Sequence, residues 1–365
     1  MRLLDFLKLR GQIVQGEKTR LARLGFISKY SAGYYNILPL GMLLMKKIQA
    51  IVEQELQNIQ AVEVAVPLVS KLKHWNVSGR DNIYSKEFIR LEGNQHILPP
   101  TSEEDMSMLL NYPCSKSQFP LLYYQTQWKF RNELRCRNEL LRTRQFLMND
   151  CYSFDLTEDA SRVTYEQISK AYSAIFKKLE LPCITIEADS KDMKGLMSHE
   201  YLVAHPEGDS IIYKSNDKYS FNGTTNKTNA IEAAHTFLLG DYYTKKFSRP
   251  INNAYLIMGC YGIGITRLMS ICSMYHKYFP KSISPLSFVI IDINNQVDSA
   301  LDTIVQHYGD QKCEIAIYTN PKNVESAIKD VHECGIDNVY ILGKDYKNSN
   351  LIEHRQASTK SKLFF

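Results

Sequence analysis

The sequence FRNELRCRNELLRTRQF, residues 130–146, lies between two stretches in which apolar and polar side chains alternate. The alternation runs from Leu122 to Phe130 before this segment and resumes from Arg144 to Phe154 after it. A period of two is typical of β-strands, so the region predicts two antiparallel strands joined by a long basic loop. The alternation places one row of polar side chains on the same face, namely Gln125, Gln127, Lys129, Arg131 and Glu133.

The five arginines and two glutamates between residues 130 and 146 allow two interpretations. A guanidinium offers a planar fork of donors that matches an oxyanion, so a row of charges on a strand suits phosphate recognition. The same residues would also suit the solvated, mixed-charge face of a surface hairpin. The segment by itself favours neither interpretation.

The chain has 365 residues, which is enough for one to three domains with a substantial core. Its net charge of +5 permits a polyanionic partner but does not require one, because acidic residues nearly balance basic ones. The eight cysteines form no CxxC pair and no zinc-binding spacing. We therefore expect reduced thiols in an intracellular protein, and no zinc.

The first residues of the chain contain neither the apolar core of a signal peptide nor the composition of a transit peptide. No window approaches 18 consecutive apolar residues, so no membrane span and no membrane partner are expected. We expect a cytoplasmic protein, with a mitochondrial or other organelle matrix as the alternative.

Hydrophobic periodicity and capping residues predict three helices, over residues 42–59, 103–110 and 159–180. Thr101 or Ser102 is expected to cap the second helix. A strand is predicted over residues 61–66 because Pro67 stops it. The stretch 215–229 is rich in Asn, Thr and Lys and predicts a surface loop.

The sequence GCYGIGITR, residues 259–267, lies between a predicted strand and a predicted helix. Its glycines predict a tight turn, but their spacing is GxxGxG rather than the GxGxxG of dinucleotide-binding proteins, and no Walker lysine is present. Arg267 falls in the first turn of the helix, where the helix N-terminus favours an anion. Close backbone packing and phosphate binding are both compatible with this pattern.

The pattern changes after residues 276–285, HKYFPKSISP, which we interpret as a linker. Strands and helices alternate beyond it, with strands predicted over 287–293, 314–319 and 338–343 and helices over 300–308 and 324–334. This βαβαβ order predicts a small α/β module whose strands are at least partly parallel.

These motifs together resemble those of class II aminoacyl-tRNA synthetases. Arg131-Asn132-Glu133, the long loop, Arg142 and Phe146 are similar to the second signature motif of that class. GCYGIGITR (259–267) resembles the third motif in the form used by bacterial-type prolyl-tRNA synthetases. The helix behind Pro39-Leu40-Gly41, together with the strand that follows it, matches the first motif.

Four further blocks resemble prolyl-specific sequences, and the resemblance covers residues 5–290 closely and the remainder loosely. The blocks are WNVSGR (75–80), PPTSEE (99–104), QFLMNDCYSF (145–154) and SHEY (198–201).

The resemblance implies an α+β fold. Residues 1–280 would form a class II catalytic domain, built on an antiparallel sheet flanked by helices. Residues 281–365 would form a shortened and divergent α/β domain of the anticodon-binding type. Members of this class usually form homodimers through the first motif.

The activity that the resemblance implies is ATP-dependent ligation of L-proline to tRNA(Pro) through a prolyl-adenylate. Arg131 would bind the α-phosphate of ATP and contact the proline carboxylate, and Arg131 and Arg267 would be the catalytic residues. Arg142 and Arg267 would hold the β- and γ-phosphates. Mg²⁺ would bridge these phosphates with help from Glu232.

The remaining site residues are implied in the same way. Glu133 would read the adenine amino group, and Phe146 would stack on the adenine ring. The proline pocket would be formed by residues that hold the imino group or line the wall, namely Thr101, Glu103, Arg131, His235 and Cys260.

Several of these residues also have a purely structural interpretation. Glu103 would then decorate a helix N-terminus, His235 would be a core histidine with satisfied hydrogen bonds, and Cys260 would be a small packing residue. His199 and Glu200 would form an ordinary strand pair.

The chain departs from the family at identifiable places. Many bacterial-type prolyl enzymes carry a large domain that hydrolyses alanyl-tRNA, and the corresponding place here is the short stretch 215–229. Leu238 replaces a glutamine usually found beside the ribose. Four residues of the second-motif loop also differ, namely Cys136, Asn138, Glu139 and Thr143.

Two other functions are compatible with the same scaffold. A synthetase-like tRNA-binding or accessory protein would be expected to lose the phosphate-binding arginines, whereas Arg131, Arg142 and Arg267 are all present. An enzyme for another amino acid is the second alternative. The threonyl enzymes use a set of zinc ligands, and no Cys/His cluster of that kind is visible in the sequence.

Overall fold

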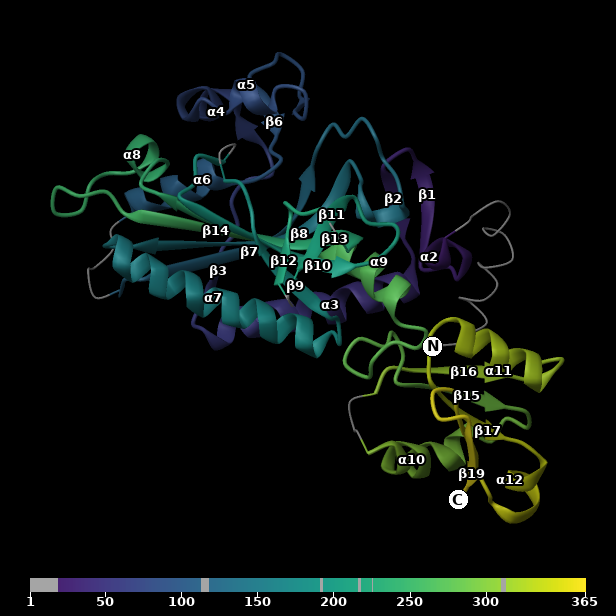
Figure 1. The fold of residues 1–365 in the computed structure, drawn as a ribbon. Helices are drawn as coiled ribbons and strands as arrows, with labels where there is room; N and C mark the ends of the chain where they lie inside the picture. The colour runs from purple at the N-terminus through teal and green to yellow at the C-terminus, as the bar shows by residue number, and fades with distance from the viewer. Residues whose placement is uncertain (1–18, 113–117, 191–192, 216–217, 225, 310–312) are drawn as a thin grey trace. The chain divides into compact units, whose positions relative to one another are not determined.

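The structure, a computed structural model, describes residues 19–112, 118–190, 193–215, 218–224, 226–309 and 313–365. The chain divides into two compact units (Figure 1). Unit 1 comprises residues up to Tyr30 together with Tyr35–Lys47 and Cys272–Phe365, and unit 2 comprises Ser31–Tyr34 and Ile48–Ile271. The functional boundary after residue 280 stays a prediction. Among the described helices, none has the length and apolar character needed to cross a membrane.

Unit 2 is built on a mainly antiparallel sheet of nine strands. The order along the sheet is β12-β11-β13-β14-β8-β7-β3, and β10 pairs with both β13 and β9. Only the short β3 pairs in parallel, with β7. The predicted antiparallel class II sheet is therefore confirmed. The strands are β3 (Val62–Glu63), β7 (Leu121–Phe130), β8 (Gln145–Asp155), β9 (Cys183–Glu187), β10 (Met197–Ala204), β11 (Ser210–Ser215), β12 (Lys218–Ser220), β13 (Lys227–Gly240) and β14 (Ile257–Gly264).

The predicted hairpin is formed by β7 and β8, which pair from Leu121 with Phe154 to Phe130 with Gln145. Its polar row is not a solvated surface, because Gln125 is 2% exposed and Lys129 is fully buried. These polar side chains face the interior, where hydrogen bonds satisfy them. The interpretation of the hairpin as a mixed-charge surface is thus wrong for this part of the strand.

The glycine-rich segment forms a strand rather than the predicted turn. β14 runs through Gly259 and Gly262 to Gly264, and the helix α9 (Ile265–Tyr275) begins at the next residue. Gly259 is needed for close packing, because a Cβ added there would collide with the Tyr261 hydroxyl group and with Ser153 Oγ. The predicted turn is therefore wrong, because the backbone of these glycines stays extended within the strand.

The helices match their predictions closely. α3 (Pro39–Asn58) begins at a proline, which is well suited to the first position of a helix. α7 (Glu158–Lys178) is capped by the Thr157 side chain and contacts β8, β13 and β14. α6 (Glu103–Met108) has Ser102 at its N-cap position and continues into the 3₁₀ turn Leu109–Asn111. The Ser102 side chain makes no capping hydrogen bond, because its Oγ accepts from Gln125 and Lys129 instead, so the predicted side-chain cap is wrong.

Two other predictions for unit 2 need correction. The strand predicted over 61–66 is reduced to β3. From Val64 onward the backbone makes only isolated hydrogen bonds to β7, including one to the Gln125 side chain, and these do not form a continuous ladder. The loop predicted over 215–229 contains β12 and the first residues of β13. Backbone pairing with β11 orders these residues although their side chains give no strand pattern.

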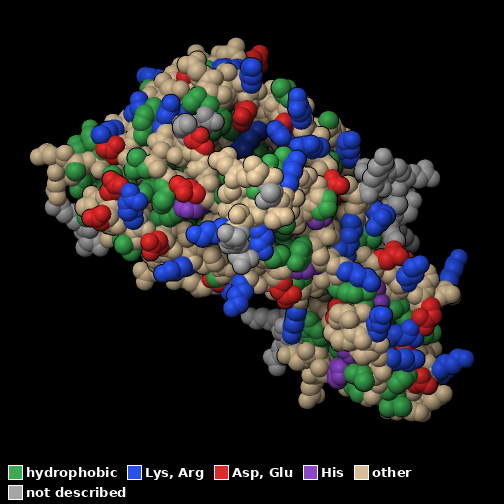
Figure 2. Space-filling view, viewed as in Figure 1, with side chains coloured by type: hydrophobic (Ala, Val, Ile, Leu, Met, Phe, Trp, Pro, Cys, Tyr) green, Lys and Arg blue, Asp and Glu red, His purple; other side chains and the backbone are tan. Residues whose placement is uncertain are grey.

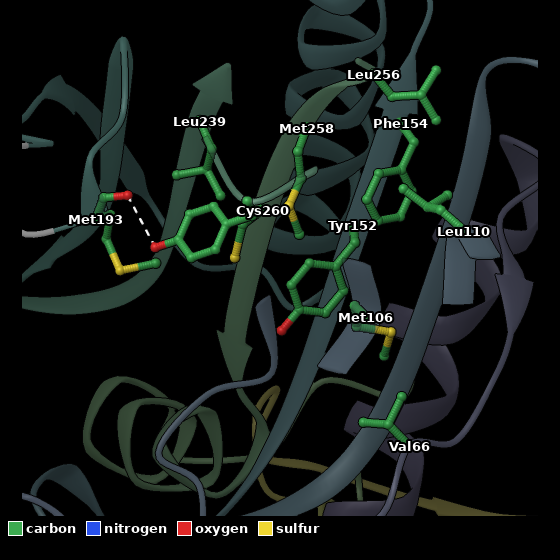
Figure 3. Packing of buried hydrophobic residues seen from close by; sticks show 11 residues of the cluster. Val66, Met106, Leu110, Tyr152, Phe154, Met193, Leu239, Leu256, Met258 and Cys260 are labelled. Atoms are coloured by element: carbon green, nitrogen blue, oxygen red, sulfur yellow. Dashed lines mark hydrogen bonds between the residues drawn. The ribbon is translucent and has the colours of Figure 1, made fainter. Parts of the chain in front are cut away.

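One hydrophobic core of unit 2 packs α6 against one face of β8 and β14 (Figure 3). Met106 from α6 lies against Tyr152 of β8 and Met258 of β14, and all three are fully buried. A small lobe precedes α6 in the chain. It contains β4 (Ser70–Lys71), α4 (Leu72–Ser78), α5 (Asp81–Tyr84), β5 (Ile89–Arg90) and β6 (His96–Leu98). The short α8 (Thr244–Phe247) also contacts α6.

Unit 1 contains the predicted βαβαβ module. β15 (Phe288–Asp292) pairs in parallel with both β16 (Ile315–Thr319) and β17 (Asn338–Leu342), and α10 (Val297–Tyr308) and α11 (Val324–Glu333) connect them. The elements at the two ends of the described chain were not predicted. They are α2 (Arg20–Arg23), β1 (Ile27–Ser31), β2 (Tyr34–Ile37), α12 (Lys344–Ser349), β18 (Glu353–Gln356) and β19 (Ser361–Phe364).

The segment 276–285 is not a solvated linker. It has no helix or strand, but Phe279 is 4% exposed and Ile283 is fully buried. The backbone of Phe279 also donates a hydrogen bond to the carbonyl of Gly335. The prolines and serines of this stretch predict an irregular backbone correctly, whereas its apolar side chains pack within unit 1.

Candidate active site

One face of the antiparallel sheet forms the floor of a cavity of about 850 Å³ in unit 2. The hollow is visible in the upper part of Figure 2, with charged side chains gathered around it. All ten residues predicted for the site line this cavity. They are Thr101, Glu103, Arg131, Glu133, Arg142, Phe146, Glu232, His235, Cys260 and Arg267.

Arg131 follows the end of β7 and presents a cation to the cavity. Its guanidinium carbon lies 5.1 Å from the centroid of the Phe146 ring on β8, which is within the range of cation–π attraction. Nη2 donates a long hydrogen bond of 3.4 Å to the carbonyl oxygen of Pro100. Nε is buried and has no hydrogen-bond partner within the described part of the chain. Arg131 therefore keeps donors available for a ligand.

Glu133 and Arg142 face each other across the basic loop. Arg142 Nε donates to Glu133 Oε2 over 2.7 Å, and the backbone N–H of Arg135 donates to Oε1 over 2.8 Å. Burial raises the pKa of Glu133, but these hydrogen bonds and the Arg142 charge outweigh it and lower the pKa overall. Glu133 is thus an ionised acceptor at the cavity wall. The Arg142 side chain, 41% exposed, also reaches Asp209 Oδ2 at 3.5 Å.

Arg267 lies in the first turn of α9 and is held by two backbone carbonyls. Its Nε donates to Leu141 O over 3.0 Å, and Nη1 donates to Glu232 O over 2.9 Å. Nη1 also lies 3.4 Å from Glu232 Oε2, and His235 Nδ1 lies 3.0 Å from Glu232 Oε1. Burial raises the pKa of Glu232, but the His235 hydrogen bond and the Arg267 charge outweigh it and bring the pKa to about 2.

Glu232 belongs to a group of three possible metal ligands. Ligand atoms of Glu200, Glu232 and His235 lie within 4.8 Å of one another, and within the described ranges no other such group of His, Cys, Asp and Glu occurs. Mg²⁺ prefers oxygen ligands and is commonly held by one or two carboxylates together with substrate phosphates. The carboxylates of Glu232 and Glu200 fit that donor set. The group contains no cysteine.

Glu200 lies on β10 opposite His235, and its carboxyl group is partly protonated near neutral pH. Burial and the charge of Glu232 raise its pKa to about 7, although His235 and Arg267 partly oppose this. The folded protein therefore holds a proton that the unfolded chain, with an ordinary pKa of 4.5, releases at lower pH.

We expect Glu200→Gln to stabilise the protein increasingly as the pH rises from 5 to 8. Between these values the wild type loses stability because the folded state resists ionisation of Glu200, and glutamine removes that cost. After allowance for solvent screening, the gain at pH 8 is roughly 1–2 kcal/mol. Thermal unfolding followed by circular dichroism measures it. A wild type that became more stable relative to the variant with rising pH would contradict the expectation.

Glu103 lies at the opposite end of the cavity and is fully buried. Thr101 Oγ1 donates to both carboxylate oxygens over 2.7 Å, Cys260 Sγ donates to Oε1 over 2.9 Å, and Arg80 Nη1 donates to Oε2 over 2.9 Å. Burial raises the pKa of Glu103, but the Arg80 charge and these hydrogen bonds outweigh it and lower the pKa. A carboxylate held in this way does not merely decorate a helix N-terminus.

The purely structural interpretations of Cys260 and His235 can be compared with their surroundings. Burial raises the pKa of the Cys260 thiol well above its ordinary value, so the thiol stays neutral and acts as a donor to Glu103. The His235 ring stacks on Phe237 with centroids 3.9 Å apart. Its Nε2 has no hydrogen-bond partner among the described residues, so His235 is not a fully satisfied core histidine.

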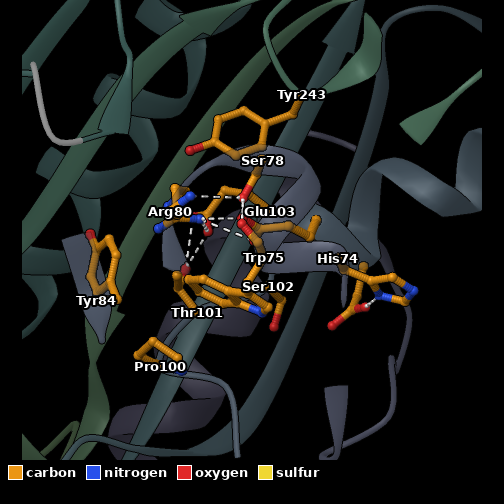
Figure 4. Close-up of polar contacts among 12 residues, drawn as sticks. His74, Trp75, Ser78, Arg80, Tyr84, Pro100, Thr101, Ser102, Glu103 and Tyr243 are labelled. Carbon is orange, nitrogen blue, oxygen red and sulfur yellow. Dashed lines mark hydrogen bonds and ion pairs between the residues drawn. The ribbon is translucent and has the colours of Figure 1, made fainter. Parts of the chain in front are cut away.

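Sequence reasoning assigned no role to two buried charged residues near the site. Arg80 in the block WNVSGR contacts Glu103 (Figure 4). Lys129 on β7 donates to Ser102 Oγ over 2.6 Å and lies 3.2 Å from Asp150 Oδ2. Lys129 and Asp150 therefore anchor the start of α6 to the sheet. The alternation of the strand, which puts Lys129 on the same face as Arg131, was the sequence feature that could have identified Lys129.

His199, a predicted strand residue, and Leu238 and Asn138, two departures from the family, contact other parts of the chain. His199 Nδ1 lies 2.8 Å from the hydroxyl of Tyr165, which also bonds Thr236 Oγ1 at 2.6 Å, so His199 links β10 to α7. Leu238 is fully buried and does not line the cavity. Asn138 donates to the backbone of Glu207 over 3.1 Å.

Comparison with known proteins places this geometry in context. The family model described as the tRNA synthetase class II core domain (G, H, P, S and T) matches residues 85–276. The proline–tRNA ligase of Ehrlichia chaffeensis is 31% identical over 93% of this chain and 91% of its own. That of Pelagibacter ubique is 30% identical over 94% of this chain and 90% of its own.

Solved prolyl-tRNA synthetases share the fold. The Giardia lamblia enzyme in complex with prolyl-adenylate aligns with a TM-score of 0.78 over 98% of this chain and 75% of its own, at 16% identity. The Cryptosporidium parvum enzyme complexed with L-proline and AMP aligns with a TM-score of 0.74 over 95% of this chain and 73% of its own, at 15% identity.

Proposed function

The chain belongs to the prolyl-tRNA synthetase family of class II, and on that premise we propose that its sheet cavity is where proline and ATP react. The protein is an ATP-dependent proline–tRNA ligase that works through a prolyl-adenylate. The observation that carries the assignment of the site is that ten residues, drawn from β8, β13, β14, α6, α9 and the basic loop, line one cavity.

The first step joins two anions, so the site must supply positive charge where they meet. A proline carboxylate oxygen bonds to the α-phosphorus of ATP, and the bond to pyrophosphate breaks. A cation shared by the carboxylate and the α-phosphate reduces their repulsion and stabilises the charge of the transition state. Arg131 is proposed for this role because its guanidinium faces the cavity with donors free of strong partners. No general base is required, since the carboxylate is already ionised.

The second step transfers the prolyl group to tRNA. A hydroxyl oxygen of the 3′-terminal ribose bonds to the acyl carbon while its proton passes to a phosphate oxygen, and AMP leaves with the electron pair of the acyl–phosphate bond. Arg131 would hold the departing phosphate as it held the α-phosphate in the first step. Arg135 and Arg137 on the basic loop are proposed to face the tRNA or solvent, since both line the cavity at its exposed side.

The nucleotide is proposed to lie over Phe146, with its phosphates between Arg142 and Arg267. Glu133 accepts from the adenine amino group, which its ionised carboxylate suits. Glu232, with Glu200 beside it, would hold Mg²⁺ together with the phosphate oxygens. The metal, when bound, neutralises part of the phosphate charge. The low pKa of Glu232 keeps that carboxylate ionised.

The proline ring is proposed to lie near Glu103, with Thr101, His235 and Cys260 at the pocket wall. The secondary ammonium of proline needs an anionic partner, and the ionised, buried Glu103 supplies one. Proline-dependent ATP–pyrophosphate exchange tests the assignment as a whole. Exchange with another amino acid but not with proline would overturn the choice of substrate. No exchange with any amino acid would favour the accessory protein.

We expect the purified enzyme to form alanyl-tRNA(Pro) at a detectable rate. The stretch 215–229 contains the strand β12 and a short exposed segment where many bacterial-type prolyl enzymes carry an editing domain. An apolar pocket separates substrates that differ by a few methylenes by only about 10- to 200-fold. Aminoacylation of tRNA(Pro) with radiolabelled alanine measures this. A purified enzyme that deacylates alanyl-tRNA(Pro) without help would overturn the expectation.

Three further properties are proposed with their support. A homodimer through the first motif is suggested by that motif and by Tyr30, which is 79% exposed on β1. A reducing compartment, the cytoplasm or an organelle matrix, is suggested by the described cysteines, none of which forms a disulfide. Anticodon binding is proposed for residues 281–365, where Lys344 and Lys347 lie on α12, whereas Arg355 already pairs with Glu325.

A further inference from the structure

Arg80 is a fully buried arginine to which the proposed function assigns no role. It follows Gly79, whose φ of +72° lets the chain turn at the end of α4. Its guanidinium carbon lies 4.7 Å from the ring centroids of both Trp75 and Tyr84, and 5.5 Å from that of Tyr243. Figure 4 shows the guanidinium among these rings. The rings hold the cation by stacking and cation–π attraction.

One nitrogen of Arg80 joins two consecutive glutamates of α6. Nη1 donates to Glu103 Oε2 over 2.9 Å and lies 3.2 and 3.1 Å from the two carboxylate oxygens of Glu104. Ser78 Oγ donates to Glu104 Oε1 over 2.6 Å, and Arg80 Nη2 lies 3.3 Å from Met193 Sδ. Ser78 and Arg80, at the end of the WNVSGR block, thus hold the first turn of α6 through hydrogen bonds.

We propose that Arg80 is a positioning residue for the substrate: held in its aromatic box, it orients the Glu103 carboxylate toward the cavity to receive the ammonium of proline. The proposal rests on the proposed role of Glu103. Glu103 lines the cavity, whereas Arg80 and Glu104 are not among the residues that line it. Arg80 therefore acts on the substrate only through Glu103.

The charges of Arg80, Glu103 and Glu104 support this role. All three side chains are 0% exposed, so two carboxylates compete for one guanidinium without help from water. Burial and the charge of Glu103 raise the pKa of Glu104, whereas the pKa of Glu103 is lowered despite burial, mainly by Arg80. Glu103 is therefore the more readily ionised carboxyl group of the pair. Lysine at position 80 would keep the positive charge but lose the planar guanidinium, whose contacts with the rings of Trp75, Tyr84 and Tyr243 direct Nη1 at both carboxylates.

The test compares two tight-binding probes that differ only at the ring nitrogen. These are 5′-O-(N-prolylsulfamoyl)adenosine and its cyclopentanecarbonyl counterpart, which has no ammonium. We expect Arg80→Lys to weaken the prolyl probe by about 10- to 100-fold, because a misplaced hydrogen bond to a charged group has that effect. The cyclopentanecarbonyl probe should change by less than about 3-fold. In pyrophosphate exchange, the KM for proline should rise while the KM for ATP stays unchanged.

Two further variants complete the experiment. Trp75→Phe shrinks the aromatic box around Arg80 but keeps the charges of Arg80 and Glu103. It should weaken the prolyl probe alone, by about 2- to 10-fold. This variant keeps the test informative even if Arg80→Lys fails to fold. Ile168→Val is the control, since Ile168 is fully buried on α7 and does not line the cavity. Equal weakening of both probes, or of neither, would overturn the role of Arg80. A wild type that binds neither probe would instead refute the proposed function.

Discussion

Arg131→Ala is expected to lower the kcat/KM for proline-dependent ATP–pyrophosphate exchange by about 10²- to 10³-fold or more, as the loss of a transition-state donor does elsewhere. The reaction brings two anions together, and Arg131 is the cation proposed to lie beside both. Replacement should hardly affect stability, because within the described structure the side chain makes only a 3.4 Å bond to Pro100 O and a cation–π contact with Phe146. Activity and melting temperature are therefore expected to separate.

Arg131→Lys is the matched variant for this experiment. Lysine retains the positive charge but provides a point charge rather than a planar fork, so it should recover only part of the activity. Exchange within about 10-fold of the wild type in Arg131→Ala would contradict the role proposed for Arg131. A melting temperature that fell together with the activity would point to a structural role instead.

Glu103→Gln is expected to raise the KM for proline by about 30-fold to several thousand-fold, with the KM for ATP unchanged. Truncating one partner of a buried, hydrogen-bonded charge pair costs about 2–5 kcal/mol, and that range corresponds to these factors. Glutamine keeps the shape of the side chain and an acceptor for Thr101 and Cys260. It removes the charge that the ammonium of proline requires.

Steady-state exchange at varied proline and varied ATP measures this separation. Glu63→Gln makes the same chemical change at an exposed position on β3 and should leave both constants unchanged. If Glu103→Gln raised the two KM values equally, a general distortion of the cavity would be the better explanation.

The sequence predicted those parts of the fold in which local pattern and tertiary environment agree. Alternation identified β7 and β8, and the apolar spacing of α3 placed Leu44, Ile48 and Leu56 on its buried side. The glycines of β14 were misread because their extended backbone is set by pairing with β8 and β13, which are distant in the sequence. Such pairing has no signature in local composition.

The candidate site could be predicted as a set of residues but not as an arrangement. Arg131, Glu133 and Arg267 stand in recognisable motifs, and the cavity that they line is made of segments far apart in the chain. Arg80 and Lys129 were missed for a different reason. A sequence pattern marks a charged residue as exposed unless its partners are known, and their partners lie 23 residues away in Glu103 and 21 residues away in Asp150.

Arg142 and Arg267 both pair with carboxylates of the chain itself, and these pairs affect which anions can bind. Arg142 is engaged by Glu133 and Asp209, and Arg267 by Glu232, so an incoming anion competes with partners already in contact. A singly charged ion gains little from such an exchange, whereas a triphosphate offers several charges to both arginines at once. If Arg142 and Arg267 hold the phosphates as proposed, we expect the cavity to favour multivalent anions and common cellular salts to inhibit nucleotide binding only weakly at this position.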